Sequence, residues 1–174
     1  MSGHILSKVI CAGLAIICLV CAGSSCICPA ERTASATEQA GTLAAVNVFA
    51  QLTDAERSIL KGAATLQSGK TGERIITQGM AMKRMTVIMT GEADVFINKK
   101  KIVTLKGQVL VGEIEFLDGK TATADVILKQ DSDLVVLDNA RLRAIMDKHP
   151  RIGYVLMHEI AKIESQRLRE TSTK

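Results

Sequence analysis

The chain has 174 residues, of which 47% are hydrophobic and 2% aromatic, with no tryptophan and one tyrosine. Its length fits one domain plus an extension, and its core must be built from aliphatic side chains and methionine. The formal net charge of +4 comes from lysines and arginines scattered among acidic residues, which argues against the clustered basic surface of a nucleic-acid-binding protein.

The N-terminal segment 1–28 predicts a signal peptide or a membrane anchor. Residues 9–28, VICAGLAIICLVCAGSSCIC, follow Lys8, carry no charge and contain all five cysteines of the chain. A basic start before an apolar stretch is typical of export signals, and the stretch is also near the length that spans a bilayer. Ala34-Ser35-Ala36 offers a cleavage site and Cys26 a lipid-attachment site. If the segment is retained, Lys8 favours a cytoplasmic N-terminus with the remainder outside.

Two alternatives to export remain for this segment: a mis-assigned start codon, or a buried helix of a cytoplasmic protein. Zinc binding by the C-x-x-C formed by Cys18 and Cys21 is disfavoured, because the pair lies inside the apolar run without a second pair or a histidine nearby. We therefore expect a membrane-anchored or exported protein of the bacterial cell-envelope type, with the membrane as a partner of the N-terminal segment.

Residues 29–46 are rich in Ala, Thr, Ser and Glu and predict a linker. The folded domain is expected over residues 47–169. Thr53 followed by Glu56 is a capping-box pattern, which predicts a helix from Thr53 to about Ala64.

After this helix the pattern changes to short β-rich runs, with glycines at or near several of their ends. These runs cover residues 73–79, 85–97, 100–107, 123–129 and 133–138. Short strands at near-regular spacing indicate a sandwich or barrel. The sequence from Asn98 to Lys101 predicts a hairpin turn, whose lysines we interpret as solvated.

Helical spacing returns at Asn139. Leu142, Ile145 and Met146 share one face of the first helix, and Pro150 then interrupts the pattern. The last helix carries an apolar stripe of Ile152, Leu156, Ile160 and Ile163. This stripe has two readings of equal weight: packing against the chain's own barrel, or pairing with the same helix of a second chain in a homodimer through residues 151–169.

The order of a helix, short strands with spaced glycines and C-terminal helices resembles the cyclic-nucleotide-binding domain, the family of the catabolite activator proteins and of the regulatory subunits of cyclic-AMP-dependent kinase. The resemblance covers about residues 47–169. It rests on the series GERIITQG (72–79), VIMTGEADVF (87–96), GEIEFLDG (112–119) and the closing LVVLD (134–138) with its downstream HP (149–150). It implies a mainly β fold with flanking helices, a β-roll or jelly roll (double-stranded β-helix).

In that family the GE loop and the short helix after it form a phosphate-binding cassette. The resemblance implies that Gly112 and Glu113 hold the glycine and the ribose-binding glutamate positions. With Ile114, Lys120, Thr121, Ala122 and Thr123, they form the candidate ligand-binding set. Glu113 has an alternative reading as a residue that caps the short helix or binds turn amides.

The family's phosphate-binding arginine is replaced here by Ala122, and Asp125 stands where a neutral hydroxyl is usual. A charge-assisted hydrogen bond to phosphate contributes roughly 1.5–3 kcal/mol, so its loss lowers affinity by about one to two decades. We expect the Asp125 carboxylate to repel a phosphate, and Lys120 to compensate in part as a point charge.

These features predict a non-enzymatic regulatory or interaction domain with a degenerate or altered pocket, no cofactor and a protein partner of unknown identity. The alternative is a functional cyclic-AMP or cyclic-GMP receptor that signals to a separate partner. Because the expected last helix lies close to Lys174, we expect no helix-turn-helix after it. The three histidines, His4, His149 and His158, form no catalytic set with nucleophiles on the expected elements.

Overall fold

The structure is a computed structural model that describes residues 42–172. The expectations for residues 1–28 and for most of the 29–46 segment lie outside this range. Within it, no helix combines the length and the apolar composition needed to cross a bilayer.

The helices and strands follow one another in the order expected for the resembled fold. They are η1 (Asn47–Phe49), α2 (Asp54–Leu60), β1 (Ala64–Gly69), β2 (Arg74–Ile76), β3 (Arg84–Ile88), β4 (Glu92–Ile97), β5 (Lys100–Lys106), β6 (Val109–Val111), α3 (Glu113–Asp118), β7 (Asp125–Leu128), β8 (Ser132–Asp138), α4 (Asn139–Lys148) and α5 (Pro150–Ser172).

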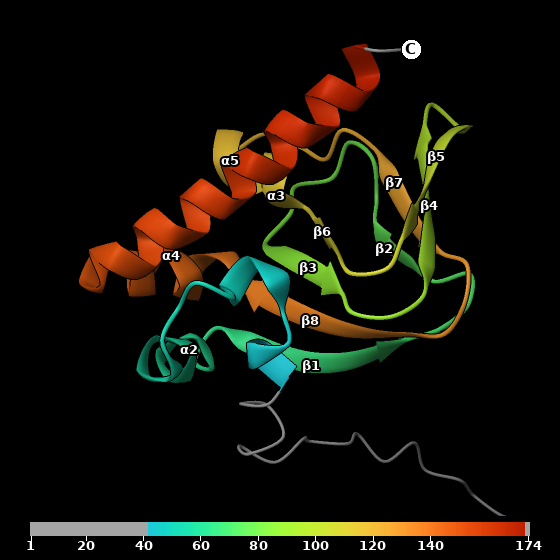
Figure 1. The fold of residues 1–174 in the computed structure, drawn as a ribbon. Coiled ribbons are helices and arrows are strands. Elements are labelled where there is room, and N and C mark those ends of the chain that lie inside the picture. The colour runs from blue at the N-terminus through green and yellow to red at the C-terminus, as the bar shows by residue number, and fades with distance from the viewer. Residues whose placement is uncertain (1–41, 173–174) are drawn as a thin grey trace, which may run out of the picture. The chain divides into compact units, whose positions relative to one another are not determined.

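The strands form two antiparallel sheets that face each other as a roll (Figure 1). One sheet has the strand order β1-β8-β3-β6 and the other β2-β7-β4-β5. Helices α2, α4 and α5 gather on one side of the roll, and α3 lies between β6 and β7 in the chain (Figure 1). The predicted fold class, mainly β with flanking helices in a β-roll, is confirmed.

Residues along the central strand β8 alternate between the two hydrophobic clusters of the core. Val135 and Leu137 lie in the cluster that includes the buried residues of the helices, whereas Leu134 and Val136 lie in the cluster between the two sheets. Successive side chains of a strand point to opposite faces. One strand therefore supplies both clusters.

The predicted β-rich runs contain strands, but the sequence predicted fewer strands than the structure has. Residues 85–97 form two strands in different sheets, separated at Gly91, whose φ of +95° favours glycine. The short strands β1 and β6 were not predicted. Asn98 and Lys99 form the two-residue β4–β5 turn with φ values of 50° and 65°, as expected for a hairpin.

The predicted helix at Thr53 begins as expected but ends at Leu60 rather than near Ala64. Residues Ala64–Gly69 instead pair with β8, from Leu137 to Ser132. The prediction of its end was wrong because this long-range pairing overrides the local helical pattern.

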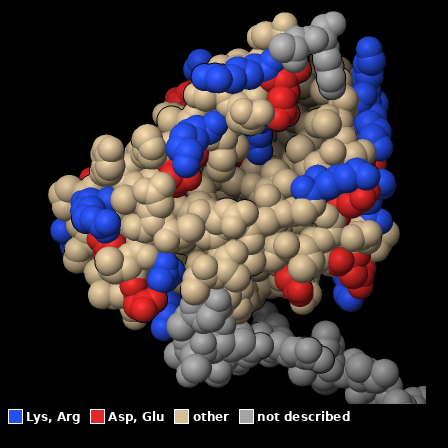
Figure 2. Space-filling view, in the orientation of Figure 1, with Lys and Arg blue, Asp and Glu red and all other residues tan. Residues whose placement is uncertain are grey.

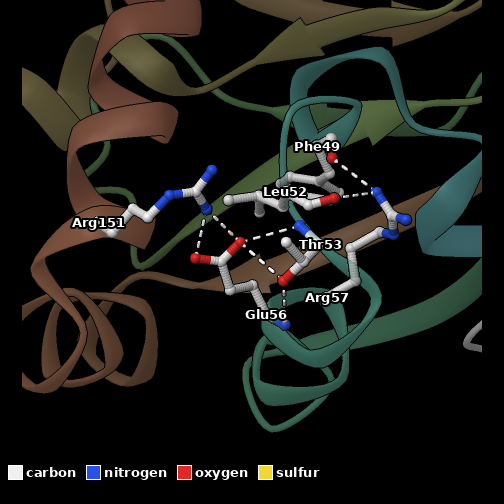
Figure 3. Close-up of polar contacts among 6 residues, drawn as sticks. All are labelled: Phe49, Leu52, Thr53, Glu56, Arg57 and Arg151. Carbon is white, nitrogen blue, oxygen red and sulfur yellow. Dashed lines mark hydrogen bonds and ion pairs between the residues drawn. The ribbon is translucent and has the colours of Figure 1, made fainter.

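Both halves of the Thr53–Glu56 capping box are present, and Arg151 of α5 extends it (Figure 3). The backbone N–H of Thr53 donates to Glu56 Oε2 at 2.8 Å, and Arg151 Nη1 donates to both carboxylate oxygens. The hydrogen bond from Arg151, followed by that from Thr53, lowers the pKa of Glu56 to about 2. Arg57 also donates to the carbonyl oxygen of Phe49 at 3.3 Å. The Arg151–Glu56 contact ties α2 to α5, and the Arg57–Phe49 contact ties α2 to η1.

The apolar stripe on α5 packs against the chain's own barrel. Ile152, Leu156 and Ile160 are buried in the core and Ile163 packs against it. Of the two readings of the stripe, the structure thus confirms intramolecular packing. Two large side chains lie outside this stripe: Tyr154, which is 70% exposed, and Leu168, which is 67% exposed.

The first described residues also contribute to the core. Leu43 and Val46 are each 1% exposed and belong to the cluster shared with the helices. The end of the predicted 29–46 linker therefore packs with the folded body.

Candidate functional site

The segment between β6 and β7 forms the predicted cassette. Gly112 precedes α3 with φ +81° and Gly119 follows it with φ +71°. A Cβ atom at Gly112 would lie 3.1 Å from the carbonyl oxygen of Arg84. Glycine at this position therefore allows both the left-handed backbone and the close approach of β3.

Glu113 lies at the start of α3 and is 2% exposed. Its Oε1 accepts a hydrogen bond from Nη1 of Arg167, which comes from the C-terminal part of α5. Arg167 also donates to Glu164 Oε1 at 2.8 Å and to the carbonyl oxygen of Leu110 at 2.7 Å. One guanidinium thus connects α5 with β6 and with the beginning of the cassette.

The second carboxylate oxygen of Glu113, Oε2, is buried and has no hydrogen-bond partner in the described part of the chain. Burial raises the pKa of Glu113 to about 7, although the charge of Arg167 acts in the opposite direction. This oxygen can accept a hydrogen bond from a ligand hydroxyl, or it can take up a proton.

The far end of the cassette packs into the roll. Ala122 is 3% exposed and belongs to the apolar cluster between the sheets. Its backbone N–H donates to the carbonyl oxygen of Met80 at 2.9 Å, and its carbonyl accepts from the N–H of Gly79 at 2.8 Å. Thr121 forms an antiparallel bridge with Ala81. Residues 121 and 122 are thereby fixed to the loop after β2.

The other predicted site residues are spread over the cassette surface. Ile114 is 37% exposed. The Lys120 ammonium lies 3.7 Å from Asp118, and its side chain is 80% exposed. The N–H of Thr123 donates to Oε1 of the buried Glu115 at 3.1 Å. Buried contacts thus hold Glu113 and Ala122, whereas the Lys120 side chain extends into solvent.

Asp125 has contacts that the sequence did not indicate. Its Oδ1 accepts from the backbone N–H of Gln78 at 2.9 Å and pairs with Arg74 at 3.2 Å. The carboxylate therefore binds β2 and the loop that follows it. Arg74 offsets this charge in part, and repulsion of a ligand phosphate by Asp125 stays a prediction.

Two residues of the site were missed by sequence reasoning. Glu115 interrupts the apolar pattern of α3 two positions after Glu113, which is a weak local signal of its buried contact. Arg167 lies 54 residues from Glu113 in the sequence, so no local pattern indicated their pairing.

Charges of both signs lie on the surface, and the histidine of α5 contacts an aromatic ring. On the face in Figure 2, basic and acidic side chains are interspersed. His158 stacks on Tyr154 with ring centroids 5.9 Å apart. Among residues 42–172, no group of His, Cys, Asp and Glu side chains is placed to hold a metal ion.

Comparisons with known proteins agree with this geometry. Residues 66–149 match the family described as "Cyclic nucleotide-binding domain". A cGMP-dependent protein kinase of Plasmodium berghei is 32% identical over 85 residues, which are 49% of this chain but 10% of the kinase. The chain thus spans a small fraction of that relative.

Solved structures show the same fold at low sequence identity. A putative cyclic nucleotide-binding protein from Geobacter metallireducens is 20% identical with a TM-score of 0.66, over 74% of this chain and 96% of that chain. The regulatory subunit of a cAMP-independent protein kinase A from Trypanosoma brucei is 24% identical with a TM-score of 0.62, over 76% of this chain and 47% of that one.

Proposed function

Residues 66–149 belong to the cyclic nucleotide-binding domain family, whose members are regulatory rather than catalytic domains, and we propose that this chain uses its domain as an interaction module with a degenerate or altered ligand pocket. The observation that carries the proposal is Ala122. It occupies the position at which the family resemblance calls for a phosphate-binding arginine, and it is buried among apolar side chains.

The neighbouring cations do not replace that arginine. Lys120 extends into solvent near Asp118, and Arg167 already binds Glu113, Glu164 and the carbonyl of Leu110. A ligand phosphate would have to break these contacts or remain without a strong partner. Because a charge-assisted hydrogen bond contributes roughly 1.5–3 kcal/mol, we expect affinity for cyclic nucleotides to be lower by about one to two decades.

The module is proposed to act at or beyond the membrane through its apolar segment 9–28, and to bind a protein partner. A second copy is one such partner. In a homodimer through residues 151–169, the exposed Tyr154 and Leu168 would supply apolar contacts, since the stripe facing the core is already covered. Fusing residues 1–40 to an enzyme that is active only outside the cytoplasm tests export, and activity of the fusion is the expected result.

A second candidate function is a working cyclic-AMP or cyclic-GMP receptor. It is favoured by the buried Oε2 of Glu113, which lacks a partner among the described residues. A ribose hydroxyl could donate to this oxygen, and hydrogen bonding to a ligand would offset the cost of its burial. The two functions differ in whether the nucleotide is the input.

Calorimetric titration of the purified chain with cyclic AMP and cyclic GMP separates them. The interaction-module proposal predicts no saturable binding at micromolar concentrations, and micromolar binding would establish the receptor instead. A ligand at about 100 times its dissociation constant should stabilise the fold by roughly 2.7 kcal/mol, so thermal unfolding gives an independent measurement.

The matched variants are Ala122→Arg and Ser58→Arg, which add the same charge at the buried cassette position and at an exposed position of α2. Gain of binding in Ala122→Arg alone is expected if the missing arginine is what disables the pocket. Equal gain in both variants would attribute binding to net charge and contradict this explanation. If Ala122→Arg does not fold, the titration of the native chain still decides between receptor and module.

A further inference from the structure

The structure has a groove outside the cassette. It is an open groove of about 690 Å³, lined by β1, β2, the loop 77–83, the start of β3, the end of β8 and the start of α4. The cassette residues 112–124 are not part of its lining. The site already described therefore does not account for this groove.

Positive charge is concentrated along the groove. Its lining contains Arg74, Lys83, Arg84 and Arg141 against a single carboxylate, that of Asp138. Clefts lined by one sign of charge and bounded by apolar walls focus the electrostatic potential and attract counter-ions. The groove therefore favours an anion.

Lys83 and Arg84 are the adjacent cations available to such an anion, whereas Arg141 donates to the carbonyl oxygen of Gly62 at 3.4 Å. Arg74 is occupied by Asp125, whereas the described part of the chain provides no ion pair for Lys83 or Arg84. Arg84 faces Asp138 across β3 and β8. The Asp138 carboxylate instead accepts from the backbone N–H of Arg141 at 2.8 Å, as the cap of α4, and leaves the Arg84 guanidinium uncompensated.

The groove also has an apolar side. Val136 and Ile75 pack with the cluster between the sheets, and Met80 on the loop is 60% exposed. Methionine side chains adapt to varied apolar partners. A ligand with a charged head and an apolar body would use both halves of the lining.

We propose that this groove binds an organic phosphate, with the phosphate held by Arg84 and Lys83 and the apolar portion against Met80 and Ile75. Guanidinium groups bind phosphate in a bidentate manner, which a halide cannot match. Two adjacent cations favour a phosphate of charge about −2 over a singly charged carboxylate. The phosphate comes either from a soluble phosphorylated compound or from a lipid headgroup. This assignment is independent of whether the cassette binds a nucleotide.

A bound ligand would act on the cassette through the loop between them. Met80 and Ala81 line the groove and also bond to Ala122 and Thr121, by a backbone hydrogen bond and a β-bridge. A change in this loop on binding would therefore be transmitted to the end of the cassette.

The test is calorimetric titration of the full chain with hexyl phosphate and with inorganic phosphate at low ionic strength. Saturable binding of hexyl phosphate, tighter than that of inorganic phosphate, is expected. The Lys83→Gln/Arg84→Gln double variant should weaken this binding by about tenfold or more, as expected for the loss of charge-assisted hydrogen bonds.

The matched control is Lys99→Gln/Lys100→Gln, which removes the same charge from the β4–β5 turn and should leave binding unchanged. Absence of binding in the native chain, equal loss in both double variants, or equal affinity for the two phosphates would overturn the proposal. Displacement of hexyl phosphate by vesicles of phosphatidylcholine with phosphatidic acid, but not by phosphatidylcholine alone, would assign the phosphate to a lipid. Lack of displacement would assign it to a soluble compound.

Discussion

The two glycines that flank α3 offer a controlled test of how tightly the cassette is built. Gly112 and Gly119 have similar left-handed backbones, with φ +81° and +71°. An added Cβ would lie 3.1 Å from the carbonyl oxygen of Arg84 at Gly112, whereas it would have no atom within 4 Å at Gly119. Alanine at either position therefore incurs the cost of a left-handed backbone. Only alanine at position 112 also meets the carbonyl oxygen of Arg84.

The shared cost is that of a left-handed L-residue, about 1–2 kcal/mol. Gly119→Ala should lower the free energy of unfolding by about this amount. Gly112→Ala should cost a further 1–3 kcal/mol, roughly, because the close atom belongs to the β3 backbone and cannot move as a flexible side chain would.

Urea unfolding of both variants measures this difference through the shift in midpoint at an unchanged slope. The native chain serves as the reference. If Gly112→Ala costs no more than Gly119→Ala, then β3 does not approach the cassette as closely as described, and the explanation for glycine at position 112 fails.

Three further predictions concern the helices and the buried carboxylate. Arg167→Met should increase amide hydrogen exchange in the last turns of α5 by about tenfold. The exposed Ser165→Met, which leaves the ion pair intact, should not; equal exchange in both would contradict the role of the guanidinium. Because the pKa of Glu113 is raised to about 7, its ionisation costs stability as pH rises from about 4.5 to 7. Glu113→Gln should therefore gain stability relative to the native chain over that interval, and a parallel pH profile in urea unfolding would refute this. Ile160→Ala should cost about 2–5 kcal/mol of unfolding free energy, but Tyr154→Ala should stay within about 0.5 kcal/mol. If the chain dimerises, its measured mass in solution should rise with protein concentration. A smaller rise in Tyr154→Ala would support the proposed dimer.

Local signals predicted those parts of the fold whose structure depends on neighbouring residues. Thr53 and Glu56 indicated the start of α2, and Asn98 and Lys99 the hairpin. The spacing along α5 indicated its buried face. By contrast, β1 has no β-branched run, and most of its residues are exposed or partly buried. It is a strand because it pairs with β8 at the edge of the sheet. That pairing is set by residues more than sixty positions later.

The candidate site likewise has residues that the sequence predicted and contacts that it did not. The glycine, the glutamate and the alanine at position 122 could be placed by comparison with the pattern of the family. Their contacts could not be predicted, because Arg167 belongs to α5 and Met80 to the loop after β2. Asp125 shows the limit of reasoning from position alone, since its pairing with Arg74 was not predicted.

Helix α5 is held by an arginine near each end. Arg151 binds Glu56 beside the N-terminal part of the domain, and Arg167 binds Glu113 in the cassette. The two arginines are sixteen positions apart in the sequence, which corresponds to about 24 Å of helix. Because a helix of this length bends little, it behaves as a rigid rod, so that releasing its cassette end would let the helix tilt about the contact between Arg151 and Glu56.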